Sequence, residues 1–260
     1  MDHERRWSFS LCMINLVAQT ALLIVLVNIV ELSAEEENRL SRSQVLTALE
    51  SGSVSLANAQ LAGIDLSNVD FRGVSLFGAN LKGADLSNAN LRGCNLDLAV
   101  LRDANLSSAD LREAQLFSTV LANAKLTGAD LREARIIANL TRANLDGANL
   151  AGAQAGADMR NQPMGLMRAH LTSATLKKAN LEGADLSRAD LSFADLSDAN
   201  LKGSNLSHAD LSGADLTGAN LEGAVLTGTT LDQAVFRNAV GLDSVEGLDT
   251  AKGKSEAIFE

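Results

Sequence analysis

The sequence predicts an all-β solenoid with short helical caps and an apolar N-terminal helix. Leucine recurs at every fifth position through most of the chain, as in "GADLSRADLSFADLSDANLKGSNL" at residues 183–206. This period matches neither the 3.6 residues of an α-helix nor the alternation of a simple strand. The apolar content of 46% comes mainly from Ala and Leu, with no Tyr and one Trp. Such a monotonous core is typical of one small unit repeated many times.

Residues 1–32 are predicted to form a membrane anchor or signal segment. No charged residue occurs between Trp7 and Val30, a stretch long enough to span a bilayer. Arginines precede it and glutamates follow it, so the positive-inside rule leaves the N-terminus in the cytoplasm and exports the repeats. An uncleaved transmembrane helix and a signal peptide cleaved near Ala34 both fit. We therefore expect membrane-anchored, extracytoplasmic repeats or, after cleavage, a secreted, periplasmic or lumenal protein.

The two ends of the repeat region are predicted to carry caps. Residues 33–53 read as a linker followed by a short amphipathic helix over 41–51, which ends before Gly52. Its role is to cover the first coil, because open strand edges invite association. Residues 241–260 keep Leu242, Val245 and Leu248 at helix-like spacing and are predicted to form the C-terminal cap and tail.

The repeats themselves fall into two tracts, 54–155 and 169–240, separated by an irregular loop at 156–168. The five-residue period slips by one residue after Ile136, and Leu140 continues it in a new phase. The loop contains Pro163, which is the only proline, and three of the five methionines. These departures predict an interruption of the solenoid.

Within each unit, leucine occupies the centre and Ala usually lies two residues before it. Asp or Asn stands between these two, and Ser, Lys, Arg, Glu or Gly follows the leucine. Inward positions thus alternate with outward ones, as in one short extended side, and the frequent Gly suits a bend between sides.

The stretch "ANLKGADLSNANLRG" and its many copies resemble the pentapeptide repeat family, written A(D/N)LXX, over roughly residues 54–240. The resemblance implies a right-handed quadrilateral β-helix with four pentapeptides per coil, so that residues twenty apart stack. It also implies two known kinds of role. Repeat solenoids offer surfaces for binding, and some family members resemble duplex DNA and protect or inhibit type II topoisomerases.

Stacking by twenty produces ladders of charged and amide side chains. Asp and Glu accompany the arginine ladder, which indicates a solvated salt-bridge face rather than an anion-binding stripe. A second ladder of Asn is a structural device. Stacked aspartates could hold a cation, but the repeat places Asp there throughout, so no metal site is predicted. These ladders are Arg72, Arg92, Arg112 and Arg132; Asn180, Asn200 and Asn220; and Asp190 over Asp210 with Asp195 over Asp215.

No catalytic, cofactor-binding or metal-binding residue is predicted, and the protein is not expected to be an enzyme. The three histidines are scattered, no Cys/His spacing fits zinc, and the glycines follow the repeat without forming a phosphate loop. Cys94 stands at an Ala position and is interpreted as an inert core residue. The net charge of −10 disfavours direct binding of nucleic acid.

One group of residues breaks the outward polarity of the repeat. Phe77, Leu98, Phe117 and Ile137 are expected on a single face, with Val100 and Val120 around the adjacent corner. A contiguous apolar patch often marks an interface. Two interpretations stay open: a partner contacts this candidate patch, or the Met-rich loop at 156–168 folds back and covers it.

The sequence therefore predicts a non-enzymatic, membrane-tethered or exported scaffold that binds an unknown protein partner, with a homodimer as one possibility. The alternative is an acidic DNA mimic that acts on a type II topoisomerase. Acidity and a rod shape fit this alternative, whereas an N-terminal segment that exports the repeats does not.

Overall fold

The computed structural model describes residues 39–52, 54–157 and 167–260. The predicted anchor or signal segment, 1–32, and most of the loop at 156–168 lie outside these residues. No helix in the described part of the chain is long and apolar enough to cross a bilayer. The chain divides into two compact units, Met1–Arg39 and Leu40–Glu260, and the second contains all of the repeats.

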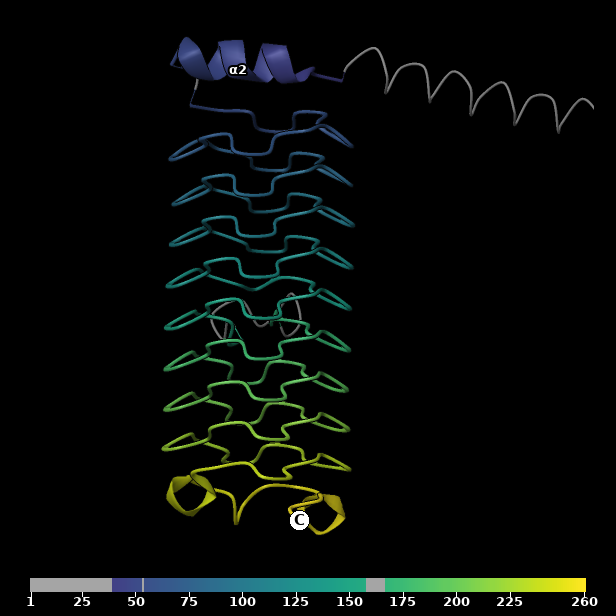
Figure 1. Ribbon diagram of the computed structural model, residues 1–260, viewed down its shortest axis with the longest axis vertical. Helices are drawn as coiled ribbons and strands as arrows, with labels where there is room; N and C mark the ends of the chain where they lie inside the picture. The colour runs from purple at the N-terminus through teal and green to yellow at the C-terminus, as the bar shows by residue number, and fades with distance from the viewer. Residues whose placement is uncertain (1–38, 53, 158–166) are drawn as a thin grey trace, which may run out of the picture. The chain divides into compact units, whose positions relative to one another are not determined.

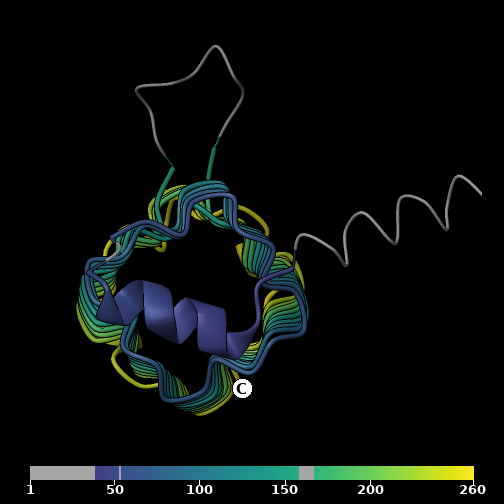
Figure 2. The same ribbon diagram turned by 90° about the horizontal axis from the view of Figure 1, so that it is seen from above.

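The unit Leu40–Glu260 is a four-sided β-helix built from stacked coils (Figure 1). Parallel bridges join each coil to the next, usually between residues twenty apart, and they form four ladders. We name the sides by the first residue of each ladder: side A begins at Ser55, side B at Gln60, side C at Asp65 and side D at Asp70. Seen along its axis, the solenoid shows these sides in register from end to end (Figure 2). The predicted all-β solenoid is confirmed.

Each unit joins its neighbours through three of its five backbone N–H groups. The residue before the leucine, which we call the bridging position, donates to the previous coil. The leucine donates to the next coil, and so does the residue two after it, the second turn position. Around Leu86 these bonds run from Asp85 to Ile64, from Leu86 to Asn105 and from Asn88 to Ser107, at 2.9, 2.7 and 3.0 Å.

The other two N–H groups are satisfied within the unit, and they explain the Asp or Asn of the repeat. The Ala89 N–H closes the turn by donating to the Leu86 carbonyl at 3.0 Å. The N–H of Ser87, at the first turn position, donates to Oδ1 of Asp85 at 2.9 Å. A buried or partly buried N–H without a partner is costly, so an Asp or Asn at the bridging position stabilises the corner that follows it.

In two units an aspartate of the previous coil accepts this bond in place of the bridging residue. Oδ1 of Asp97 accepts from the Phe117 N–H at 2.7 Å, and Oδ1 of Asp146 accepts from the Lys177 N–H at 3.0 Å. The bridging residues of these units are Gln115 and Thr175.

The core is a column of buried leucines and alanines that runs through all coils. Three polar residues at the Ala position are accommodated by one repeated bond, whereas the hydroxyl of buried Ser204 has no hydrogen-bond partner among the described residues. The side chains of Cys94, Thr119 and Thr229 each donate to the carbonyl of a central residue 23 positions earlier, at 2.7–2.8 Å. Burial raises the pKa of the Cys94 thiol to about 12, so the thiolate needed for reactivity is scarce at neutral pH.

The solenoid continues through the predicted interruption, which corrects that expectation. The slip in the five-residue period shortens one segment of side A by one residue. Arg135 lies on the side A ladder, and Asn139 already lies on the side B ladder. The loop leaves the next segment of side A after Ala157 and returns at Met167. Asn139 then bridges His170, 31 residues later, so the ladders resume in register.

The N-terminal end is covered by α2, Arg42–Glu50, which lies across the first coil (Figure 2). Ser41 and Gln44 form a capping box at its start. Val45 is fully buried against the core, and Arg42 donates to the carbonyls of Asp65 and Ser67 at 2.7 and 3.0 Å.

The C-terminal end differs from its helix-like sequence pattern. The ladders extend through Glu246, Lys252 and Ile258, which bridge residues 21, 22 and 23 positions earlier. The longer corners contain 3₁₀ turns, η2 at Leu242–Ser244 and η3 at Lys254–Glu256. Backbone pairing with the preceding coil therefore outweighs the local helical spacing. The ring of Phe259 stacks on Phe236 with centroids 5.0 Å apart and closes the core.

Candidate interaction surfaces

Three residues of the candidate patch lie together on corner AB, the turns between sides A and B. Phe77, Leu98 and Phe117 come from successive coils, because the Gly78 N–H donates to the Asp97 carbonyl and the Leu98 N–H donates to the Phe117 carbonyl, both at 2.9 Å. Phe77 and Leu98 are 38% and 49% exposed, and Phe117 is half-buried. The topology thus places three large apolar side chains on one edge of the solenoid.

Ile137 does not belong to this surface, because only 6% of it is exposed. It lies on the shortened segment of side A, where a bend at Ala138 replaces the usual two-residue turn. The turn that would hold residue 137 outward is therefore absent from this segment. Val100 and Val120 bridge each other on side B and are half-buried beside the corner.

The described end of the Met-rich loop lies near one end of the patch. Met167 lines a cavity of about 320 Å³ together with Val120 and Ile137. The guanidinium of Arg135 also lies over the Phe117 ring, 4.9 Å from its centroid, in a cation–π contact. Phe77 and Leu98 remain exposed. Residues 158–166 lie outside the described chain, so cover by the loop stays a prediction.

A further exposed aromatic residue escaped the sequence interpretation. Phe193 is 65% exposed and lies on corner BC, between sides B and C. It occupies the second turn position with a φ of 58°, and Leu98 does the same with a φ of 62°. This left-handed conformation favours Gly and Asn and is unusual for bulky residues. The Phe193 ring lies against Gly213, where a Cβ would approach it to 2.6 Å. The sequence signal that could have revealed Phe193 is a large residue at a turn position that usually holds Gly or Asn.

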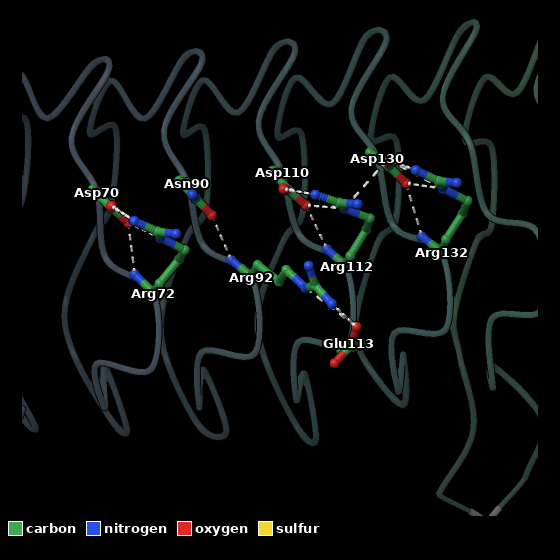
Figure 3. A network of polar contacts seen from close by, with 9 residues as sticks. All are labelled: Asp70, Arg72, Asn90, Arg92, Asp110, Arg112, Glu113, Asp130 and Arg132. Atoms are coloured by element: carbon green, nitrogen blue, oxygen red, sulfur yellow. Dashed lines mark hydrogen bonds and ion pairs between the residues drawn. The ribbon is translucent and has the colours of Figure 1, made fainter.

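The predicted salt-bridge face on side D is confirmed (Figure 3). Arg72, Arg112 and Arg132 each pair with the aspartate two residues earlier at 2.6–2.7 Å. Asn90 stands at the bridging position before Arg92, which instead pairs with Glu113 of the next coil at 2.7 Å. Hydrogen bonds from the arginines lower the pKa values of Asp70, Asp110 and Asp130. The charges of this face are therefore largely matched.

The stacked aspartates of the second tract also have cationic neighbours. Nζ of Lys177 lies 3.0 Å from Oδ2 of Asp195, and Arg168 lies 3.5 Å from Oδ2 of Asp190. Burial would raise the pKa of Asp190, but bonds from Ser192 and the charge of Arg168 hold it below the usual value. No group of three or more His, Cys, Asp or Glu in the described ranges is arranged to hold a metal ion.

The amide ladder is longer than the spacing of twenty predicts. Side-chain hydrogen bonds at 3.2, 3.0 and 3.4 Å connect its four members. The spacing of twenty does not predict Asn149, because the loop places it 31 residues before its partner Asn180. The members are Asn149, Asn180, Asn200 and Asn220.

Comparison with known proteins decides the family. The model of pentapeptide repeats matches residues 55–93, 94–133, 138–161, 166–203 and 204–240. The chain belongs to the pentapeptide repeat family. Membership implies the right-handed form of the four-sided β-helix. Two gaps in the match, at 134–137 and 162–165, fall on the shortened segment of side A and within the loop.

Solved structures of other pentapeptide repeat proteins are similar to this one. HetL, involved in heterocyst differentiation regulation in the cyanobacterium Nostoc sp. strain PCC 7120, is 30% identical over 85% of this chain and 95% of its own, with a TM-score of 0.43. A protein from the Arabidopsis thaliana thylakoid lumen is 33% identical over 49% of this chain and 68% of its own, with a TM-score of 0.25. Trypsin-treated QnrB1, a plasmid-mediated fluoroquinolone resistance protein, is 20% identical over 76% of this chain and 84% of its own, with a TM-score of 0.46. The search of curated proteins found no relative.

Proposed function

We propose that this pentapeptide repeat protein is a non-enzymatic scaffold that binds another protein through corner AB. The observation that supports the proposal is the placement of Phe77, Leu98 and Phe117 on successive coils, with two of them substantially exposed. Turn positions elsewhere on the solenoid mostly carry small or polar residues. A contiguous apolar edge on a rigid solenoid is a typical binding surface.

Site-specific photo-crosslinking in cells tests this proposal. A photoreactive amino acid at Leu98 should give a discrete adduct that Phe77→Ser with Phe117→Ser abolishes while the β-rich circular dichroism spectrum is kept. The same amino acid at Asn88, an equivalent turn position on side C with a φ of 56°, is the matched control. Absence of an adduct at Leu98, or equal adducts at both positions, would refute the scaffold surface.

We further propose that residues 1–32 tether or export the repeats. Support comes from the uncharged stretch Trp7–Val30 and from the charge asymmetry around it. Protease added to intact cells stripped of their outer layers should digest or release the repeat domain. Full protection of the repeats, together with labelling of them in the cytoplasm, would contradict export.

A second candidate function is mimicry of nucleic acid toward a type II topoisomerase. The observation that favours it is the uneven acidity: residues 169–260 contain seven Lys or Arg and fourteen Asp or Glu, against nine and ten in residues 54–155. An acidic surface can occupy a site for a phosphate backbone. Inhibition of, or protection in, a supercoiling assay with purified gyrase would support this candidate, and no effect at micromolar protein would remove it.

A further inference from the structure

We propose that the coil of residues 239–260 is a self-association surface on which two copies of this chain pair end to end. This coil lies at the opposite end of the solenoid from α2 (Figure 1). The surface is separate from corner AB of the first tract, so the inference goes beyond the proposed scaffold role and does not depend on it.

The backbone edge of this coil is open. Its four bridging residues accept hydrogen bonds from the preceding coil through their carbonyls. The C=O and N–H of one trans peptide point in opposite directions, so the N–H of the residue after each bridging residue points away from the solenoid. These N–H groups have no acceptor in the described chain. The bridging residues are Val240, Glu246, Lys252 and Ile258, and the open N–H groups belong to Gly241, Gly247, Gly253 and Phe259.

A second copy can complete this edge. The bridging N–H groups also donate to the preceding coil, so the carbonyl of the residue before each of them points outward as well. Each side therefore offers one donor and one acceptor, placed on either side of its bridging residue. A two-fold axis across the end of the solenoid runs the facing sides in opposite directions. Antiparallel strands form two hydrogen bonds around such a directly opposed pair of residues.

Head-to-tail stacking of copies is blocked, because α2 covers the first coil at the N-terminal end (Figure 2). The open edge can therefore pair only with the same edge of another copy. Such an isologous contact closes as a dimer and does not continue into a filament.

The bridging residues favour one register of this dimer. Val240 on side D and Ile258 on side C are 55% and 39% exposed. Glu246 on side A and Lys252 on side B are exposed, and neither forms an ion pair with another described residue. A two-fold axis from corner AB to corner CD sets side A against side B, and side D against side C, of the other copy. Glu246 then faces Lys252, and Val240 faces Ile258.

The four-sided cross-section allows three other two-fold registers, and each is less favourable. An axis through sides A and C sets Glu246 against Glu246, and an axis through sides B and D sets Lys252 against Lys252. The remaining diagonal axis sets Glu246 against Val240 and Lys252 against Ile258. Like charges placed opposite repel, and a charge buried against an apolar side chain loses its hydration without gaining a partner.

The corners of the coil are less complementary than its sides. Asp249 lies at corner AB, on the axis, and faces Asp249 of the second copy. Asp243 of η2 meets η3, which carries both Lys254 and Glu256. The sides therefore determine the register, and Asp249 weakens the association.

Charge reversal tests the pairing in the full chain, by analytical ultracentrifugation in a density-matched detergent. Lys252→Glu should raise the dimer dissociation constant about tenfold, because two-fold symmetry creates the repulsive contact twice. Glu246→Lys should act likewise, and the double variant should return to within about twofold of the parent. Asp249→Asn should lower the dissociation constant, because it removes the repulsion on the axis.

Lys125→Glu is the matched control, because Lys125 is an exposed lysine at a bridging position of the first tract. It should leave the dissociation constant unchanged. A monomer at every concentration, equal effects of Lys252→Glu and Lys125→Glu, or no recovery in the double variant would overturn the end-to-end dimer. A dimer that none of these variants changes would also overturn it, because association would then use another part of the chain.

Discussion

Side D of the first repeat tract and side B of the second meet the same backbone requirement with different chemistry. In residues 54–155, Asp70, Asp110 and Asp130 accept the first turn N–H, and the arginine at that position also forms an ion pair with the aspartate. In residues 169–240, Asp190 and Asp210 accept the same N–H bond, but serine holds the first turn position and adds a hydroxyl bond of 2.6 Å. The geometry of the corner is the same in both tracts, and only the charge differs.

This difference shows that the backbone geometry of a corner does not depend on the net charge of its side chains. A side-chain oxygen at the bridging position satisfies a backbone donor of the corner, and the amide oxygens of Asn90 and Asn95 do this as well as the aspartates. The residue that follows the leucine then decides whether the negative charge is matched. The first tract is nearly neutral and the second is acidic, although both have the same Leu and Ala core.

The largest expected effect tests whether the two cores are equivalent. Leu111→Asp and Leu191→Asp place a carboxylate at fully or almost fully buried positions of the first and second tract. Each should lower the free energy of unfolding by roughly 4 kcal/mol or more, since an unpaired buried charge must be neutralised or exposed. Urea denaturation would measure both. Ser192→Asp, on the outside, should cost much less, about 1–2 kcal/mol, because it loses only the hydroxyl bond to Asp190 and places a second carboxylate beside it. Equal loss from Leu191→Asp and Ser192→Asp would refute the alternation of inward and outward positions.

An intermediate effect distinguishes the junction between the tracts from the exposed corner. Ile137→Ala should cost about 2–4 kcal/mol, because the side chain is buried on the shortened side. Phe77→Ala should cost less, about 1 kcal/mol, because its ring is already partly in water. Thermal melts of the two variants give the comparison. If Ile137→Ala lowered the free energy of unfolding no more than Phe77→Ala does, Ile137 would be an exposed member of the surface patch and not a buried residue.

The smallest effect tests the charge difference itself. Asp110→Asn keeps the acceptor for the turn N–H but removes the ion pair with Arg112, and should cost about 0.5–1 kcal/mol at pH 7. Asp210→Asn also keeps its acceptor and should leave stability unchanged or slightly higher, because it reduces the acidity of the second tract.

The effect of Asp110→Asn should also depend on pH. Hydrogen bonds from Arg112 hold the pKa of Asp110 below 3.8 in the folded protein. The folded state therefore binds the proton less readily than the unfolded state, so the stabilisation is complete above that value and is lost as pH falls through the lowered pKa. Urea denaturation at pH 7 and at about pH 2 should show a smaller difference between parent and Asp110→Asn at the lower pH. A difference of the same size at both pH values would mean that the ion pair is not its cause.

Much of the fold could be predicted from the sequence, because each unit is local and repeated. The alternation around Leu86, the aspartate before it and the turn after it all act within one unit and with the coil above or below. The arginine ladder on side D was predictable for the same reason, since Arg72 and Arg112 pair with aspartates two residues away. The candidate patch was only partly predictable. Phe77, Leu98 and Phe117 follow the period and lie together, whereas Ile137 was wrongly placed on the surface because one turn residue is missing from its side.

The sequence by itself determined the solenoid class, the inward and outward positions and the polarity of the corners, because these depend on side-chain size, hydrogen-bonding capacity and backbone freedom within five residues. Only the tertiary structure decided what happens where the period fails. Pairing between coils continues the ladders across the loop, from Asn139 to His170. It also places residues 241–260 in a last coil, although their apolar residues have helix-like spacing. The physical reason is that backbone hydrogen bonding between coils acts on residues 20–31 apart, and no local pattern shows which distant rung an irregular segment will meet.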